Sequence, residues 1–245
     1  MNRYVTCILL CVVLPLLFSN AKGGPPFQTD DPEPVDYLHW EFYVASMQEY
    51  AGGETDATLP HIEINYGALP NLQIHLLTPM GYLNGIEGPK YGYANTEFGM
   101  KYRFVQEDST IPQIGVFPLI EIPTGDKAQG LSDGNAQVYL PVWVQKSFGK
   151  FTTYGGGGYW LNFGAGNRNW TFAGWEVQYD FSDLLTIGGE GFYHTAEAQD
   201  AKPGAGFNFG GFLNVNEHNH ILFSVGHSLM GAPATTGYIG YQFTT

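Results

Sequence analysis

Apolar and polar residues alternate with a period of two from residue 37 to the end of the chain. The clearest example is residues 97–104, in which every second side chain is apolar: Phe98, Met100, Tyr102 and Phe104. Between them stand Glu97, Lys101 and Arg103. Successive side chains of a β-strand point to opposite faces, so this alternation predicts strands with one apolar face.

Twelve such stretches occur, most of them about ten residues long, which is the length a tilted strand needs to cross a bilayer. Because every strand carries an apolar face, the pattern predicts an all-β fold: a transmembrane antiparallel β-barrel of about twelve strands, up-and-down, over residues 37–245. The stretches are residues 40–45, 61–66, 72–76, 97–104, 114–121, 137–145, 152–161, 170–179, 184–194, 205–215, 220–228 and 238–243.

The connections alternate between short and longer segments, as the two ends of an outer-membrane barrel do. The short set includes residues 67–70 and 180–183, and the longer set includes 50–58, 81–94 and 230–235. This order places both termini in the periplasm. A secreted β-sandwich also alternates and stays open as an alternative architecture.

The N-terminal residues have a different pattern. Residues 1–21 combine one positive charge with an apolar run too short to span a membrane as a helix, which predicts a secretory signal peptide. Both cysteines lie inside it, so the exported chain has no thiol. Residues 22–36 are rich in proline and acidic residues and predict an extended periplasmic arm.

Composition supports a membrane barrel and excludes one class of partner. The chain has 33 glycines, 16% aromatic residues and only 13% charged residues, whereas soluble domains have about 25%. Its formal net charge of −13 repels nucleic acid, so no nucleic-acid partner is expected. The expected partners are outer-membrane lipid, lipopolysaccharide and the barrel-assembly machinery, and the expected location is the bacterial outer membrane.

Charged side chains on the strands should face the interior, because a charge in contact with lipid costs about 2 to 4 kcal/mol at the bilayer midplane. We expect Glu63 to pair with His75 across a hairpin, and Lys101 and Arg103 to neutralise inward glutamates. The predicted lumen-lining residues are Glu41, Glu63, His75, Glu97, Lys101, Arg103, Glu121, Trp143, Trp160, Glu176, Glu190 and His194.

Two interpretations of this interior stay open. The charged pairs and rings could form a selective constriction for aromatic solutes, or they could fill a small barrel and keep it shut. Glycine clusters such as residues 155–158 lack the lysine of a phosphate loop and are expected to make room for large rings.

Catalysis is not expected. His227 and Ser228 are adjacent on a strand and point to opposite faces, so the histidine cannot activate the serine. The turn containing His218 and His220 offers too few ligands for a metal. The sequence therefore predicts no enzyme, no catalytic or metal-binding residues and no cofactor.

Three stretches resemble a bacterial outer-membrane family of transporters attributed to the MetA pathway of phenol degradation. They are GPPFQTDDPEP at residues 24–34, LPVWVQKSFG at 140–149 and GGGGYWLN at 155–162. The resemblance extends over nearly the full chain and implies a porin-like barrel that passes small aromatic or hydrophobic compounds. We therefore expect an outer-membrane channel for passive uptake of such compounds. The alternatives are a closed structural or adhesive barrel without transport, and then an outer-membrane hydrolase.

Overall fold

The computed structural model describes residues 24–245, so the predicted signal peptide lies outside the described residues. The chain forms fourteen β-segments and one short 3-10 helix, η1. No helix in the described residues is long and apolar enough to cross a membrane. The elements are β1 (Trp40–Ala51), β2 (Glu54–Leu69), β3 (Leu72–Gly85), β4 (Gly88–Tyr93), β5 (Thr96–Val105), β6 (Gln113–Val116), β7 (Leu119–Ile122), η1 (Lys127–Gln129), β8 (Gln137–Phe148), β9 (Phe151–Asn162), β10 (Trp170–Asp180), β11 (Leu185–His194), β12 (Gly204–Asn216), β13 (Asn219–Met230) and β14 (Ala234–Thr244).

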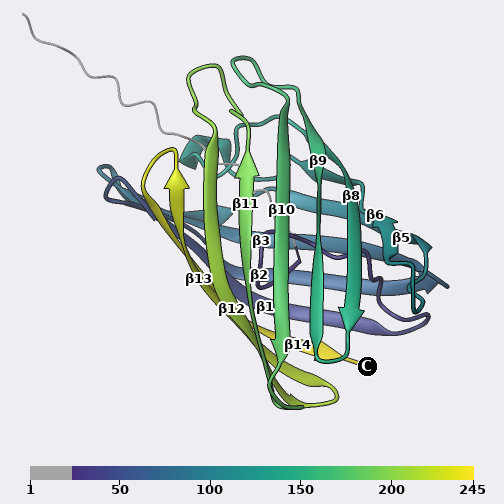
Figure 1. The fold of residues 1–245 in the computed structure, drawn as a ribbon. Helices are drawn as coiled ribbons and strands as arrows, with labels where there is room; N and C mark the ends of the chain where they lie inside the picture. Colours follow the sequence, from purple (N-terminus) through teal and green to yellow (C-terminus); the bar gives the residue numbers. More distant parts are fainter. Residues whose placement is uncertain (1–23) are drawn as a thin grey trace, which may run out of the picture.

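The segments close into one antiparallel barrel (Figure 1). β1 pairs with β14, and the β3–β5 and β7–β8 pairings complete the wall. β4 and β5 both pair with β3 and form one interrupted strand. β6 and β7 form another, broken at Pro118, which has no N–H to donate. The barrel therefore has twelve strands, which confirms the predicted fold.

The two faces of the wall differ as the alternation predicted. On β5, Phe98, Met100 and Tyr102 are exposed on the outside, whereas Glu97 and Lys101 are buried. The other strands repeat this arrangement and leave a belt of exposed apolar side chains around the barrel. Such a belt is stable only in lipid, so the sandwich alternative is excluded.

The ends of the barrel are distinguished by the termini. Trp40 begins β1 and Thr245 follows β14, and the Thr245 N–H donates to the Trp40 carbonyl at 3.0 Å. We call this the termini end and the opposite one the loop end.

The longer connections predicted at the loop end are shorter than expected. Residues 50–58 and 81–94 lie mostly in strands, with turns at Gly52-Gly53 and Ile86-Glu87. Gly52 and Gly53 have φ values of 60° and 88°, a conformation that favours glycine in tight turns. The β1–β2 and β3–β4 hairpins therefore extend farther at the loop end than the sequence predicted.

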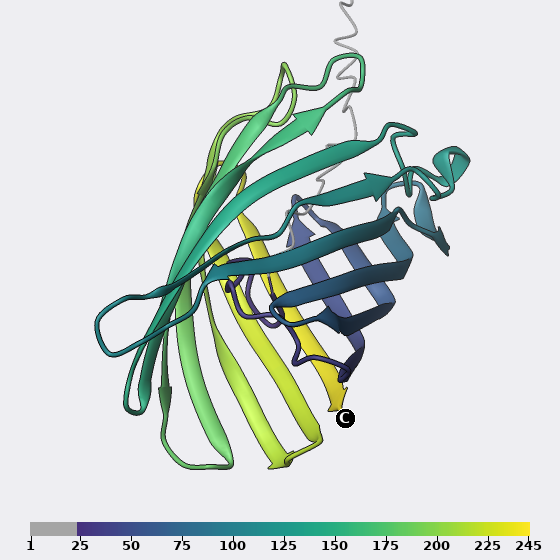
Figure 2. The same ribbon diagram turned by 90° about the vertical axis from the view of Figure 1, so that its right-hand side faces the viewer.

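The N-terminal arm lies inside the barrel, which corrects the predicted periplasmic position. Residues 24–36, called the arm below, run from the termini end into the middle of the interior (Figure 2). Thr29 and Asp30 are 0% and 2% exposed. The Val35 N–H donates to Gln73 Oε1 at 2.9 Å, and the Pro26 carbonyl accepts from Ser224 Oγ at 2.6 Å. These contacts lie on β3 and β13, so the arm crosses the interior from one wall to another.

Candidate functional site in the barrel interior

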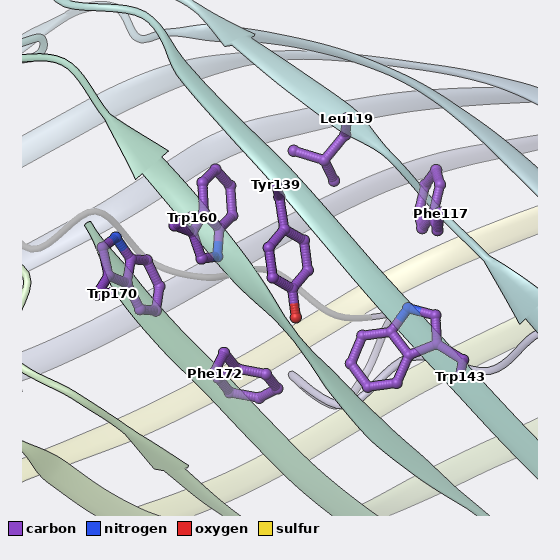
Figure 3. Packing of buried hydrophobic residues seen from close by; sticks show 7 residues of the cluster. All are labelled: Phe117, Leu119, Tyr139, Trp143, Trp160, Trp170 and Phe172. Carbon is purple, nitrogen blue, oxygen red and sulfur yellow. The ribbon is translucent and has the colours of Figure 1, made fainter.

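Aromatic side chains cover the inner face of β8, β9 and β10 (Figure 3). The rings of Tyr139 and Trp160 stack with centroids 4.6 Å apart, and those of Trp160 and Trp170 stack at 5.3 Å. Trp143 and Phe172 extend this group toward the termini end, with centroids 6.4 Å apart. We call these five residues the aromatic wall. Stacked pairs contribute about 0.5–1.5 kcal/mol each beyond their burial.

Strand register explains the stack. Tyr139 is the Cα partner of Trp160, and Trp160 is the partner of Trp170, so the three rings lie at one depth. Gly158 gives them room, because a methyl group there would lie 2.5 Å from the Pro141 Cα and 2.6 Å from the Tyr139 ring. The glycine cluster therefore accommodates large rings, as the sequence predicted.

The polar atoms of the aromatic wall are unused. Within residues 24–245, the indole nitrogens of Trp143, Trp160 and Trp170 and the hydroxyl of Tyr139 have no hydrogen-bond partner. Leaving a buried donor without a partner costs about 1–3 kcal/mol. A solute that stacks on these rings and carries an acceptor atom would remove that cost.

A polar network faces the interior from β2, β3 and β5. Glu63 accepts from the Asn65 amide at 2.8 Å and lies 3.4 Å from both His61 Nε2 and His75 Nδ1. His75 Nε2 lies 3.2 Å from Glu97 Oε1. The predicted contact of Glu63 with His75 is confirmed, but it is diagonal, because Asn65 is the residue directly opposite His75.

The two strand cations pair with the arm, which corrects the prediction that they neutralise strand glutamates. Lys101 Nζ lies 2.9 Å from Asp30 Oδ1 and 3.5 Å from Asp31 Oδ1. Arg103 lies 3.5 Å from Glu33. The side chains of Lys101 and Asp30 are 8% and 3% exposed, so this pair is held away from water.

Glu190 on β11 binds the other part of the arm. Its carboxylate accepts from the backbone N–H groups of Gln28 at 2.8 Å and Thr29 at 2.7 Å, and from the Asn208 amide at 2.5 Å. Hydrogen bonds to a charged group contribute about 1.5–3 kcal/mol each. The arm is therefore fixed to opposite sides of the interior, by Lys101 on β5 and by Glu190 on β11.

Glu176 is buried beside this anchor and is unpaired. It is the register partner of Glu190, is 0% exposed, and neither carboxylate oxygen has a hydrogen-bond partner among the described residues. A methyl group at Gly188 would lie 2.1 Å from its Oε1, so Glu176 packs directly on the neighbouring strand.

The structure places all twelve predicted lumen-lining residues on the inner face of the barrel. Besides those already described, Glu41 accepts from the Tyr43 hydroxyl at 3.0 Å, and Glu121 accepts from the Asn95 amide at 2.8 Å. His194 Nδ1 lies 3.2 Å from Glu197 in the following loop. The arm residues were not predicted to lie in the interior. The sequence did contain one indication, because the arm is acidic and two strand cations, Lys101 and Arg103, were predicted to face inward.

Cavities occupy the interior on both sides of the arm. One of about 120 Å³, called the arm cavity, lies between the arm and the walls that include β1, β2 and β14. Two more, of about 170 and 100 Å³, lie toward the loop end. A fourth, of about 310 Å³, lies at the termini end beside Glu33 and Arg103. The arm stands between the last cavity and the other three.

Neither catalytic nor metal-binding geometry is evident in the described residues. His227 is exposed on the outer face, where its Nδ1 lies 3.2 Å from Thr235 Oγ1, while Ser228 contacts Ala234. No group of three or more His, Cys, Asp or Glu residues within 24–245 is placed to hold a metal ion.

No protein-family model and no curated protein matches the sequence. Solved structures do match. The crystal structure of the COG4313 outer membrane channel from Pseudomonas putida F1 is similar with a TM-score of 0.74 and 15% identity, over 88% of this chain and 98% of that chain. The NanC porin has a TM-score of 0.59 at 9% identity, over 82% and 98% of the two chains. The KdgM porin has 0.57 at 12%, over 82% and 98%. These similarities show the outer-membrane barrel fold, and the likeness to the phenol-degradation family stays a resemblance.

Proposed function

We propose that this protein is an outer-membrane channel for passive uptake of small aromatic or hydrophobic compounds. The observation that carries the proposal is the aromatic wall, which contains a stack of three rings and has four polar atoms without a partner in the described residues. A planar solute could replace ring contacts along this wall and accept hydrogen bonds from the indole groups. The fold shared with outer-membrane channels and porins supports a transport role.

The arm limits how such a channel works. Because it crosses the interior and its ion pair is buried, a solute can pass only when the arm moves or when a narrow path opens beside it. The proposal is therefore a selective path with a low conductance, and not a wide diffusion pore.

A closed barrel without transport is the second candidate, and the filled interior favours it. Both strand cations are neutralised by the arm, and the aromatic wall is buried. Under this alternative the arm is a permanent part of the core, and releasing it would destabilise the barrel without opening a path.

Uptake into liposomes separates the two candidates. Refolded protein would be reconstituted, and entry of phenol would be compared with entry of cyclohexanol, which has the same ring size without the aromatic face. We expect faster phenol entry in the wild type, and a loss of several-fold in Trp160→Ala, because one stacked pair contributes about 0.5–1.5 kcal/mol. Trp175→Ala is the matched control, since the side chain of Trp175 lies on the outer face of β10 and is 52% exposed.

The channel proposal fails if wild-type vesicles take up neither solute faster than protein-free vesicles and show no conductance in planar bilayers. An equal phenol rate in Trp160→Ala and Trp175→Ala would leave a channel but remove the aromatic wall from its path.

A further inference from the structure

We propose that the arm cavity is a binding site for a small organic cation, an ammonium group attached to a single ring or to a smaller apolar body. The inference extends the proposed function by giving the charge of the preferred ligand. It requires only that a solute reach the cavity, and transport through the whole barrel is not needed for it.

Carboxylates outnumber cations in the lining of the arm cavity. Lys101 is its one amine, and it is already paired with Asp30 at 2.9 Å. Its two histidines, His61 and His75, lie 3.2–3.4 Å from Glu63 and Glu97.

Glu41 and Glu49 also line the cavity, and within residues 24–245 neither makes an ion pair. Glu41 interacts at longer range with Lys101, and Glu49 with His194, but neither carboxylate is in direct contact with a cation of the described residues, so both face the cavity with part of their charge uncompensated. Water screens charges poorly in the barrel interior, so these carboxylates attract a cationic ligand and repel an anionic one.

The buried hydroxyl of Tyr238 also indicates a ligand, independently of the charges. Tyr238 on β14 lines the arm cavity, is 8% exposed, and its hydroxyl has no hydrogen-bond partner in the described part of the chain. Its ring packs with Tyr43 in a small cluster of buried side chains. The hydroxyl oxygen can accept a hydrogen bond from an ammonium N–H, and a quaternary ammonium cannot supply one.

The size and apolar surface of the cavity limit the body of the ligand. Its volume of about 120 Å³ is smaller than the roughly 150 Å³ of an engineered cavity that holds one benzene, so a ligand with one ring must extend into a neighbouring cavity. Met47, Leu77 and Phe117 supply apolar contact. Aromatic faces attract cations within about 6 Å, so Tyr43 and Tyr238 favour an ammonium as well, whereas the face of Phe117 already holds Lys101 Nζ at 5.2 Å.

Glu49 lies where this cavity meets the next one. It lines both the arm cavity and the cavity of about 100 Å³ that is walled by Trp170, Phe172 and Phe192. A ligand held by its ammonium at Glu49 can therefore place its ring on the aromatic side. This position connects the charged cavity with the aromatic wall.

The test compares three ligands that share one ring and differ in charge: benzylammonium, benzyl alcohol and benzoate. Binding to the full-length refolded barrel would be measured by calorimetry in detergent at low ionic strength. We expect benzylammonium to bind at least tenfold more tightly than benzyl alcohol, and benzoate not to bind measurably. Equal affinities for the three ligands would overturn the proposal.

Two variants locate the site. Glu49→Gln keeps the size of the side chain and should remove most of the preference for benzylammonium over benzyl alcohol. Glu87→Gln is the matched control, because Glu87 is exposed in the β3–β4 turn and is paired with Lys90, so its variant should bind as the wild type does. An unchanged preference in Glu49→Gln would contradict the assignment.

Tyr238→Phe removes one oxygen and keeps the ring. It should weaken benzylammonium several-fold and leave benzyltrimethylammonium, which has no N–H, unaffected. An equal loss for both ligands would show that the hydroxyl is not part of the site. Each variant would first be checked for the gel-mobility shift of a folded barrel. For wild-type protein, the reversal potential in a salt gradient is a second measurement, and we expect its sign to show selectivity for cations.

Two outcomes separate the cation site from the channel. Phenol uptake without any preference for benzylammonium would support the channel and overturn the cation site. Preferential binding of benzylammonium without any uptake would support the site and overturn the channel.

Discussion

Replacing Lys101 by methionine should release the arm from the interior. Methionine has a similar volume and no charge, so the change leaves Asp30 without its cation 2.9 Å away. Asp30 is 2% exposed, so the carboxylate has almost no contact with solvent while the arm stays in place. Moving the arm into solvent is the simplest way to hydrate this carboxylate.

The size of the effect follows from the burial of the pair. Removing one partner of a buried ion pair costs about 3–5 kcal/mol, because the other charge stays buried and uncompensated. With about 1.4 kcal/mol per tenfold change, the population with a released arm should increase on the order of 10² to 10³-fold. Residual bonds of Glu190 to the arm would oppose release without cancelling this change.

Thiol labelling measures this release directly. The sequence has two cysteines, Cys7 and Cys11, both in the predicted signal peptide, so Thr29→Cys protein produced from residue 22 onward has a single thiol. Thr29 is 0% exposed, and a polar maleimide can reach position 29 only after the arm leaves. We expect the labelling rate of folded Thr29→Cys protein to increase about a hundredfold or more when Lys101→Met is added.

Lys90→Met is the matched control. Lys90 pairs with Glu87 at 2.6 Å on the surface, where an ion pair contributes about 0–1 kcal/mol, so labelling should stay near the wild-type rate. Adding Asp30→Asn to Lys101→Met should recover part of the protection, because the uncompensated charge is gone. If Lys101→Met protein migrates as a folded barrel and labels no faster than the Lys90→Met control, the Lys101–Asp30 pair does not hold the arm in the interior.

Three further predictions concern the anchor and the wall. Glu190→Gln removes the charge that accepts two backbone hydrogen bonds from the arm, and labelling at position 29 should increase about tenfold or more. Trp160→Ala should lower the free energy of unfolding by about 3–5 kcal/mol, measured with urea in lipid vesicles, and Trp175→Ala by much less. Gly158→Ala should reduce the yield of folded barrel on gels because the methyl group meets backbone at 2.5 Å, while Gly191→Ala, with no atom within 4 Å, should fold normally.

Alternation along the chain predicted most of the strands and the faces of their side chains, although the connections at residues 50–58 and 81–94 proved to be mostly strand. A period of two needs no knowledge of distant partners, because the pleat sends successive side chains to opposite sides. Since the outside is lipid, the apolar row of a strand, such as that of Phe98, was expected to face out, and a charged residue such as Lys101 was expected to face in. Twelve stretches of the right length then favoured a barrel over a sandwich, and the closed wall of the structure excludes the sandwich.

Contacts inside a wall were also predictable where a hairpin brings the residues together. Glu63 and His75 are twelve positions apart across one turn, and they do meet, although diagonally. Trp143 and Trp160 of the aromatic wall were predicted to face inward, but the stack of rings depends on the register among β8, β9 and β10, which the pattern does not give.

What fills the barrel depends on contacts between segments that are far apart in the chain, and these contacts are seen only in the tertiary structure. The arm has no alternation, because it belongs to no sheet, and its proline and acidic residues are equally compatible with solvent. Its position is decided by partners far along the chain: Asp30 and Lys101 are 71 positions apart, and Thr29 and Glu190 are 161 apart. A local pattern fixes the face on which a charge lies, whereas the partner that neutralises it depends on which segments the closed barrel brings together across its interior.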